Sequence, residues 1–299
     1  MAGMAPDADV LIRSASDPLL ALEFHRHFTH SLSFVPIGAL GCAVLLWPLC
    51  RRYITFARCY LFSLLGFASH GLLDACTSYG TRLLWPFSDA RIAWDIISVV
   101  DPLFTVPLIA LVAIGAWKRR AGFALCGIVW CCAYLLLGVL QHQRAQDAAD
   151  ALALRRGHTV DRLVVKPTFG NLVLWKSIYE HDGRYYIDAI RVGRAAETIE
   201  GSSLPGLDLG RDFPWLAAST GQARDVARFR EFADDFLAVD PMNPLRIVDL
   251  RYSLVPTRGD GLWGIELDPN AAAEAHAAYV TMRIRSFAEG RELLDMIFR

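Results

Sequence analysis

The chain has almost no net charge and no cysteine in its C-terminal half. Its 30 Lys and Arg residues face 31 Asp and Glu residues, which gives a formal net charge of −1. The protein therefore lacks the overall positive field that holds a nucleic-acid backbone, and no nucleic-acid partner is expected. All seven cysteines lie before residue 133, and none has CxxC spacing. We interpret them as small apolar side chains rather than as metal ligands or a redox pair.

The charged residues are distributed unevenly along a chain that is apolar on average. Hydrophobic residues make up 54% of the sequence, and the mean hydropathy is +0.31, which excludes a disordered chain and indicates a membrane protein. Residues 1–140 carry 10 Lys and Arg and 8 Asp and Glu, whereas the remainder carries 20 and 23. The first 20 residues hold four charged side chains and no apolar run, which argues against a cleaved signal peptide.

The apolar part predicts a multi-pass α-helical membrane domain of about four spans. Ser33–Cys50 and Ala121–Leu140 are uncharged runs of 18 and 20 residues, enough to cross a hydrocarbon core of roughly 30 Å. Cys59–Leu73 is shorter, but it becomes long enough when it is extended to Phe56 and Asp74, with Arg58 reaching a headgroup. Pro102–Trp117 is a similar run.

Basic residues between the spans predict the orientation. Arg51, Arg52 and Arg58 lie between the first and second spans, and Lys118–Arg120 lie between the third and fourth. Because Lys and Arg favour cytoplasmic loops, both loops are expected in the cytoplasm. The other segments would then share the extracytoplasmic side, namely residues 1–32, the loop 74–95 and everything after residue 141.

The charged part predicts a different kind of structure. We expect a membrane domain at residues 1–141, a polar, Ala-rich linker helix at 142–157 and a soluble extracytoplasmic α+β domain at 158–299. Runs rich in β-branched and aromatic residues, separated by turn sequences, predict a mainly antiparallel sheet of about five or six strands. One helix is expected at Ala223–Leu237. The sequence leaves open whether this domain covers a membrane site or binds a partner.

Three short motifs hold the side chains best suited to chemistry. PDAD, HRHFTHS and SHGLLDACTSYG supply acidic and imidazole groups that all map to the extracytoplasmic side: Asp7, Asp9, His25, His30, His70 and Asp74. His70 and Asp74 are four apart and share one helix face, a common spacing for two metal ligands. His25 and His30 are five apart, which would separate them by about 140° on a straight helix, so a turn is needed between them.

A cation would explain why these groups occur together near a membrane. A charged side chain at membrane depth costs about 2.5–3.5 kcal/mol, so it persists mainly when it is paired or bound. Imidazole and carboxylate ligands suit a divalent metal such as Zn, Mn or Fe, and an open coordination position can activate water. The alternative for His70 is a packed helix-end histidine with Asp74 as its acceptor, and Asp7 and Asp9 would then be solvated.

In this order the motifs resemble the YdjM-like family of bacterial inner-membrane metal-dependent hydrolases, with its pattern PDxD, HRxxTHS and HxxxD. The resemblance covers at least residues 6–105 and implies a multi-pass inner-membrane protein with a metal-dependent hydrolase site. Its motif matches fall on the same six residues. Members of the family usually have an apolar helix ahead of PDxD, whereas this sequence opens almost directly on PDAD. We expect either that this helix is encoded upstream of Met1 or that this member lacks it.

The leading hypothesis is a membrane-bound enzyme. His25, His30, His70 and Asp74 would be the principal metal ligands, and a metal-activated water would attack an ester or phosphoester. Asp7 and Asp9 are predicted as catalytic residues, either as general base or as further ligands. The expected partners are membrane lipid and a small-molecule or lipid-derived substrate. The alternative is a non-enzymatic membrane scaffold or interaction protein with a structural metal site.

Two flanking residues have two readings each. Arg26 could stabilise developing negative charge on a substrate, or it could form an ion pair with Glu23 or contact a headgroup. Asp101 precedes Pro102, so it could cap the helix that begins there or act as an outer acceptor for the site. We favour the cap.

Overall fold

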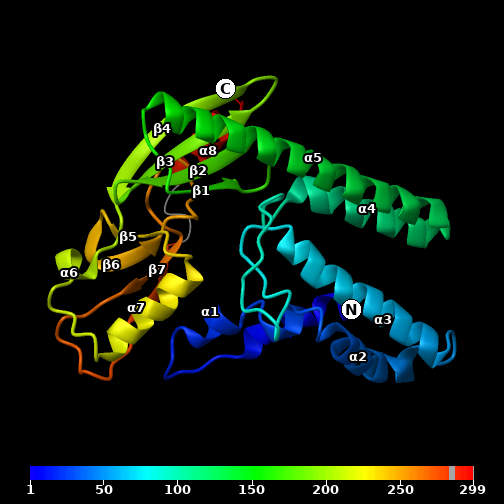
Figure 1. Ribbon diagram of the computed structural model, residues 1–299. Coiled ribbons are helices and arrows are strands. Elements are labelled where there is room, and N and C mark those ends of the chain that lie inside the picture. The colour runs from blue at the N-terminus through cyan, green and yellow to red at the C-terminus, as the bar shows by residue number, and fades with distance from the viewer. Residues whose placement is uncertain (283–286, 299) are drawn as a thin grey trace. The chain divides into compact units, whose positions relative to one another are not determined.

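The computed structural model describes residues 1–282 and 287–298 of the chain (Figure 1). It divides into two compact units, an N-terminal unit of Met1–Trp94 and a C-terminal unit of Asp95–Arg299. The division falls between the second and third of the predicted spans.

The N-terminal unit consists of two longer helices preceded by short helical segments. The four short segments are η1 (Ala2–Met4), η2 (Pro6–Leu11), α1 (Leu20–Phe24) and η3 (Phe28–His30). The longer helices α2 (Val35–Cys50) and α3 (Phe56–Ala75) pack side by side and are joined by a short turn (Figure 1). Thr55 begins α3, because its hydroxyl accepts a hydrogen bond from the Arg58 amide.

A small core holds α2 against α3. Val35, Ala39 and Phe67 are buried together. A Cβ at Gly38 would lie 2.3 Å from the Phe67 ring, so only glycine leaves room for that ring. Much of the remaining apolar surface is exposed; Leu45 of α2, for example, is 77% exposed. Such surface is suited to lipid rather than to water.

Two antiparallel helices begin the C-terminal unit. α4 (Pro102–Lys118) packs against the first half of α5 (Ala121–Arg155). The Asp101 carboxylate accepts hydrogen bonds from the Leu103 and Phe104 amides, which confirms the predicted helix cap. The hydroxyl of Tyr134 on α5 donates to the other oxygen of Asp101 at 2.8 Å, so the cap also joins the two helices.

The rest of the unit contains two antiparallel sheets. The first has the order β1 (Arg162–Pro167), β2 (Leu174–His181), β3 (Arg184–Val192), β4 (Ala196–Pro205). The second has the order β5 (Leu237–Asp240), β6 (Asn243–Asp249), β7 (Trp263–Glu266), β8 (Ala278–Thr281). Three further helices are α6 (Leu209–Asp212), α7 (Gly221–Phe232) and α8 (Phe287–Phe298). All strand pairings are antiparallel, as predicted, but the strands form two four-stranded sheets instead of a single sheet.

Both faces of the first sheet are covered. On one face, a core cluster joins the first sheet to the second. It contains Ile178, Tyr185 and Ile187 of the first sheet, Val248 of β6 and Phe236, which directly precedes β5. The second half of α5 contacts the strands of the first sheet, where its Ala and Leu side chains are buried. Residues 142–155 therefore continue the same helix as the fourth predicted span and lie against the sheet.

The predicted helix at Ala223–Leu237 is wrong at its end. Helix α7 stops at Phe232, and Leu237 already begins strand β5. Asp234 and Asp235 between them have φ values of 49° and 58°, in the left-handed region that cannot continue a helix. Apolar spacing alone did not reveal this turn.

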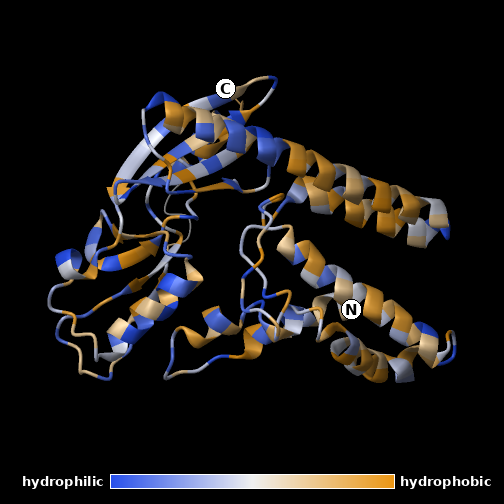
Figure 2. Ribbon diagram, in the orientation of Figure 1, coloured by the Kyte–Doolittle hydropathy of each residue, from blue (hydrophilic) through white to orange (hydrophobic). Residues whose placement is uncertain are grey.

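Hydropathy follows the helices. Figure 2 shows hydrophobic residues concentrated on α4 and the adjoining half of α5, and more hydrophilic residues in the half that lies on the sheet. Among the described residues, α3 and α5 are long and apolar enough to cross a membrane, and Leu20–His30 with Val35–Cys50 forms a third candidate bent by 85°. α4 has 17 residues, about 25 Å at 1.5 Å per residue. The structure thus supports two or three spans, and the fourth stays a prediction.

Candidate metal centre

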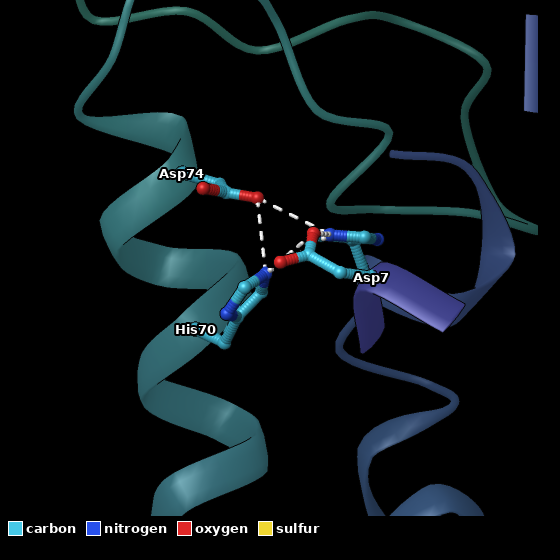
Figure 3. Close-up of side chains that lie close together, drawn as sticks. Asp7, His70 and Asp74 are labelled. Atoms are coloured by element: carbon cyan, nitrogen blue, oxygen red, sulfur yellow. Dashed lines mark hydrogen bonds and ion pairs between the residues drawn. The ribbon is translucent and has the colours of Figure 1, made fainter. Parts of the chain in front are cut away.

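Four of the predicted site residues meet in the N-terminal unit. Asp7 comes from η2, His30 from η3, and His70 and Asp74 from the end of α3. One ligand atom of each lies within 4.8 Å of all the others, and we call these four residues the donor cluster. Figure 3 shows Asp7 approaching His70 and Asp74 from a separate segment. Segments more than 60 residues apart in sequence therefore converge on one point.

The distances within the donor cluster are short and nearly equal. The Nε2 atoms of His30 and His70 are 3.2 Å apart. Asp7 Oδ1 lies 3.4 Å from His30 Nε2 and 3.2 Å from His70 Nε2. Asp74 Oδ2 lies 3.2 Å and 3.4 Å from the same two nitrogens. All these atoms can act as metal ligands when the imidazoles are neutral and the carboxylates ionised.

This spacing fits a small divalent cation. Ligands at 2.0–2.1 Å from a tetrahedral Zn ion are about 3.3–3.4 Å from one another, close to the observed separations. Asp74 Oδ2 is also buried, and it has no hydrogen-bond partner among the described residues. Two imidazole nitrogens and two carboxylate oxygens that face one another need a cation or additional protons among them. The donor set therefore fits a divalent metal ion.

Asp9 forms a second layer behind the donor cluster. Its side chain is completely buried, and its Oδ1 lies 3.1 Å from His25 Nδ1. Its Oδ2 lies 3.3 Å from His30 Nδ1 and accepts hydrogen bonds from the Arg26 amide and the Thr29 hydroxyl. Burial would raise the pKa of Asp9, but the hydrogen bonds from His25 and His30 hold it well below its usual value.

The carboxylate of Asp9 fixes the orientation of His30. His30 Nδ1 lies 3.0 Å from the Thr29 hydroxyl oxygen, which itself donates to Asp9 Oδ2, and 3.3 Å from that Asp9 oxygen. Both oxygens favour a proton on Nδ1, which leaves the lone pair of Nε2 directed into the donor cluster. The same argument applies to His25, whose Nδ1 faces the other oxygen of Asp9. Metal-binding histidines are commonly held by a carboxylate in this way.

A left-handed residue brings the two histidines to the same carboxylate. Arg26 has φ 59°, a conformation that costs a residue other than glycine on the order of 1 kcal/mol. This bend separates α1 from η3 and supplies the turn that the five-residue spacing of His25 and His30 requires. The loop after α3 holds the bend, because the Arg82 amide donates to the Arg26 carbonyl.

A glycine lets α3 approach η3. A Cβ at Gly71 would lie 2.5 Å from the His30 carbonyl oxygen, so any larger residue would push the two elements apart. Gly71 follows His70 directly, and the close approach therefore acts on the donor cluster itself. The HG pair was present in the motif, but its meaning is visible only once η3 is placed against the helix.

The remaining predicted residues have the following positions. Asp9 and His25 adjoin the donor cluster but do not belong to it, and the His25 and His30 rings are 6.3 Å apart. The role of His25 as a ligand stays a prediction. The Arg26 guanidinium lies against Asp74, with its Nε 3.3 Å from Asp74 Oδ2. Sequence analysis did not anticipate this pair, because the residues are 48 positions apart.

Comparison with known proteins agrees with the motifs. The family model described as YdjM inner membrane protein matches residues 1–145, which contain the whole donor cluster. Inner membrane protein YbcI of Escherichia coli (strain K12) is 35% identical over 138 residues, 42% of this chain and 78% of that protein. Uncharacterized protein YfhP of Bacillus subtilis (strain 168) is 29% identical over 255 residues, 83% of this chain and 74% of that protein.

No solved structure matches the chain significantly. The similarity to YfhP covers 83% of this chain and therefore extends beyond residue 145 into the part of the C-terminal unit that contains the sheets. The match to YbcI covers most of that protein and lies close in length to the family region. The chain therefore belongs to the YdjM inner membrane protein family.

Proposed function

We propose that the protein is a membrane-bound, metal-dependent hydrolase of an ester or phosphoester. The observation that supports this most is the convergence of two carboxylate oxygens and two imidazole nitrogens from three segments on one point. Asp7, His30, His70 and Asp74 would hold the cation. When bound, a Zn, Mn or Fe ion there would polarise the substrate's carbonyl or phosphoryl oxygen and make water more acidic.

The protein's own residues have separate tasks in this proposal. Asp9 is fully buried and both of its oxygens are engaged, so we assign it to orienting His25 and His30 rather than to proton transfer. His25 Nε2 makes no hydrogen bond to the described residues, and its side chain is 28% exposed. We assign proton uptake during hydrolysis to this atom. Asp7, at 50% side-chain exposure, would face the substrate.

We further propose the membrane arrangement of the site. Four spans, with α4 as the third, would place the donor cluster and the C-terminal sheets on the extracytoplasmic side. The basic residues of the turns after α2 and α4 support this orientation. His70 and Asp74 lie in the last turns of the apolar helix α3, so the donor cluster would lie near the lipid boundary, which favours a lipid-derived substrate.

Metal analysis with a hydrolysis screen tests the proposal. The full-length protein is purified in detergent, and bound metal is quantified for the wild type, His70→Ala and Asp74→Ala, with His276→Ala as a histidine control outside the N-terminal unit. The proposal expects metal in the wild type and the control, loss in both cluster variants, and turnover of an ester or phosphoester that follows metal content.

Two results would contradict it in different ways. Equal metal content in the wild type and both cluster variants would contradict a metal site at the donor cluster. Metal that depends on the cluster, without turnover on a broad panel of carboxylic esters and phosphoesters, would instead support a structural metal in a membrane scaffold.

A further inference from the structure

Arg26 is a buried cation in contact with one member of the donor cluster. It is 7% exposed, and its Nε lies 3.3 Å from Asp74 Oδ2. Its Nη1 donates to the Thr77 hydroxyl at 2.8 Å and to the Asp74 carbonyl at 3.4 Å. Its guanidinium carbon lies 5.1 Å from the centre of the Tyr79 ring. The side chain is therefore fixed on several sides.

The main chain of Arg26 contacts Asp9, the buried carboxylate behind the donor cluster. Its amide donates to Asp9 Oδ2 at 2.8 Å, and the left-handed φ of Arg26 directs this amide and the side chain to different carboxylates. Asp9 holds His30, while Asp74 lies beside both His30 and His70. A single residue thus contacts Asp9, which adjoins His30, and Asp74, which adjoins both His30 and His70.

Three side chains have nitrogen atoms close to the same Asp74 oxygen, and Arg26 can fix the orientation of this carboxylate. Its Oδ2 lies within 3.4 Å of nitrogen atoms of Arg26, His30 and His70, yet it has no hydrogen bond of good geometry to any residue that the structure describes. A buried carboxylate that loses its cationic partner turns toward another hydrogen-bond donor. This reorientation would remove an oxygen ligand from the donor cluster.

From this geometry we infer that Arg26 is a positioning residue for metal binding. Its guanidinium holds the Asp74 carboxylate in place beside His30 and His70, and its amide fixes Asp9. The inference rests on the proposed metal site. It differs from the interpretations available from sequence, since Arg26 acts here on a ligand rather than on the substrate or on Glu23.

Cobalt binding to the full-length protein in detergent tests the inference. Co²⁺ is titrated into metal-free wild type, Arg26→Gln and Arg26→Lys, and affinity is followed together with the visible absorption spectrum, which reports the ligand geometry. Loss of an outer-shell partner typically weakens metal binding about 10–100-fold. We expect a loss of this size and a changed spectrum for Arg26→Gln, with partial recovery of both for Arg26→Lys.

Arg251→Gln is the matched control. Arg251 is also buried and pairs with an aspartate, Asp249, but it lies in the C-terminal unit. A variant of this pair should lower thermal stability and leave cobalt affinity and spectrum unchanged. A merely structural role for Arg26 would give the same result as Arg251→Gln, and wild-type affinity and spectrum in Arg26→Gln would overturn the inference.

Two further comparisons keep the outcome decisive. If Arg26→Gln does not fold, Thr77→Val removes the hydrogen bond to Nη1 without removing the charge. It should weaken cobalt binding less than tenfold but measurably, and unchanged binding would then overturn the inference. Failure of the proposed metal site itself is recognised separately, because the wild type would then bind cobalt no better than His70→Ala.

Discussion

Replacing Gly71 by alanine should separate helix formation from metal binding. The added Cβ would lie 2.5 Å from the His30 carbonyl oxygen, where an ordinary contact needs about 3.4 Å. His30 must therefore move away from α3 by about 0.9 Å, or α3 must shift by the same amount. Metal–ligand distances tolerate only about 0.2 Å, so a displacement of this size removes one ligand.

The helix itself should not suffer from this substitution. Alanine is more favourable than glycine within a helix by about 1 kcal/mol, which offsets part of the strain. We therefore expect helical content by circular dichroism to stay at the wild-type level, while the affinity for Co²⁺ falls at least tenfold. Gly41→Ala is the control, because a Cβ at Gly41 on α2 meets nothing within 4 Å.

One result would refute this reasoning. If Gly71→Ala bound cobalt with the affinity of the wild type and Gly41→Ala, the contact between His30 and α3 would not determine the ligand geometry. A loss of binding shared by both variants would also contradict it, since only one of them disturbs the donor cluster.

Three further predictions concern other buried polar groups. Asp9→Asn should weaken cobalt binding about 10–100-fold, measured by titration, because an amide no longer favours the protonated Nδ1 of His30. Tyr134→Phe should lower the free energy of unfolding by about 1–3 kcal/mol, measured by thermal denaturation in detergent, because buried Asp101 loses its hydroxyl donor. The C-terminal unit should become more stable as pH rises from about 7 to about 10, because burial lowers the pKa of Lys176 to about 7.

The sign for Lys176 follows from proton binding. Its Nζ donates to the Ser253 hydroxyl and the Arg258 carbonyl, and between pH 7 and 10 the unfolded chain binds the proton that the folded chain has released. The gain is on the order of 4 kcal/mol at 1.36 kcal/mol per pKa unit, and Lys176→Met should abolish it. A pH profile of unfolding that is the same in both proteins would contradict this. Wild-type cobalt affinity in Asp9→Asn would contradict the prediction for Asp9. An unchanged free energy of unfolding in Tyr134→Phe would contradict the prediction for Tyr134.

The sequence predicted those features that depend on local pattern. The i, i+4 spacing of His70 and Asp74 predicted that both lie on one face of a helix, and the apolar run before them predicted the approximate bounds of that helix. Helix α3 carries both residues. Asp101 before Pro102 predicted a cap for the same reason, since capping involves only neighbouring residues. Antiparallel strands followed from short turns between β-rich runs.

Features that depend on distant contacts were not accessible in the same way. Nothing local indicates that Arg26 would adopt a left-handed conformation or lie against Asp74, since both depend on how η3 meets α3. The division of the strands into two sheets likewise depends on which faces bury Ile187 and Val248. The three motifs and the predicted membrane orientation indicated that acidic and imidazole groups meet, whereas their order around the site needed coordinates.

X-ray absorption at the zinc edge tests the central claim most directly. The full-length protein, loaded with one equivalent of Zn²⁺, should show nitrogen and oxygen ligands at about 2.0–2.1 Å, with outer-shell scattering from two imidazole rings. His30→Ala and His70→Ala should each remove one ring from this signal or abolish binding. A zinc spectrum without imidazole scattering, or one that neither variant changes, would contradict a metal centre at the donor cluster.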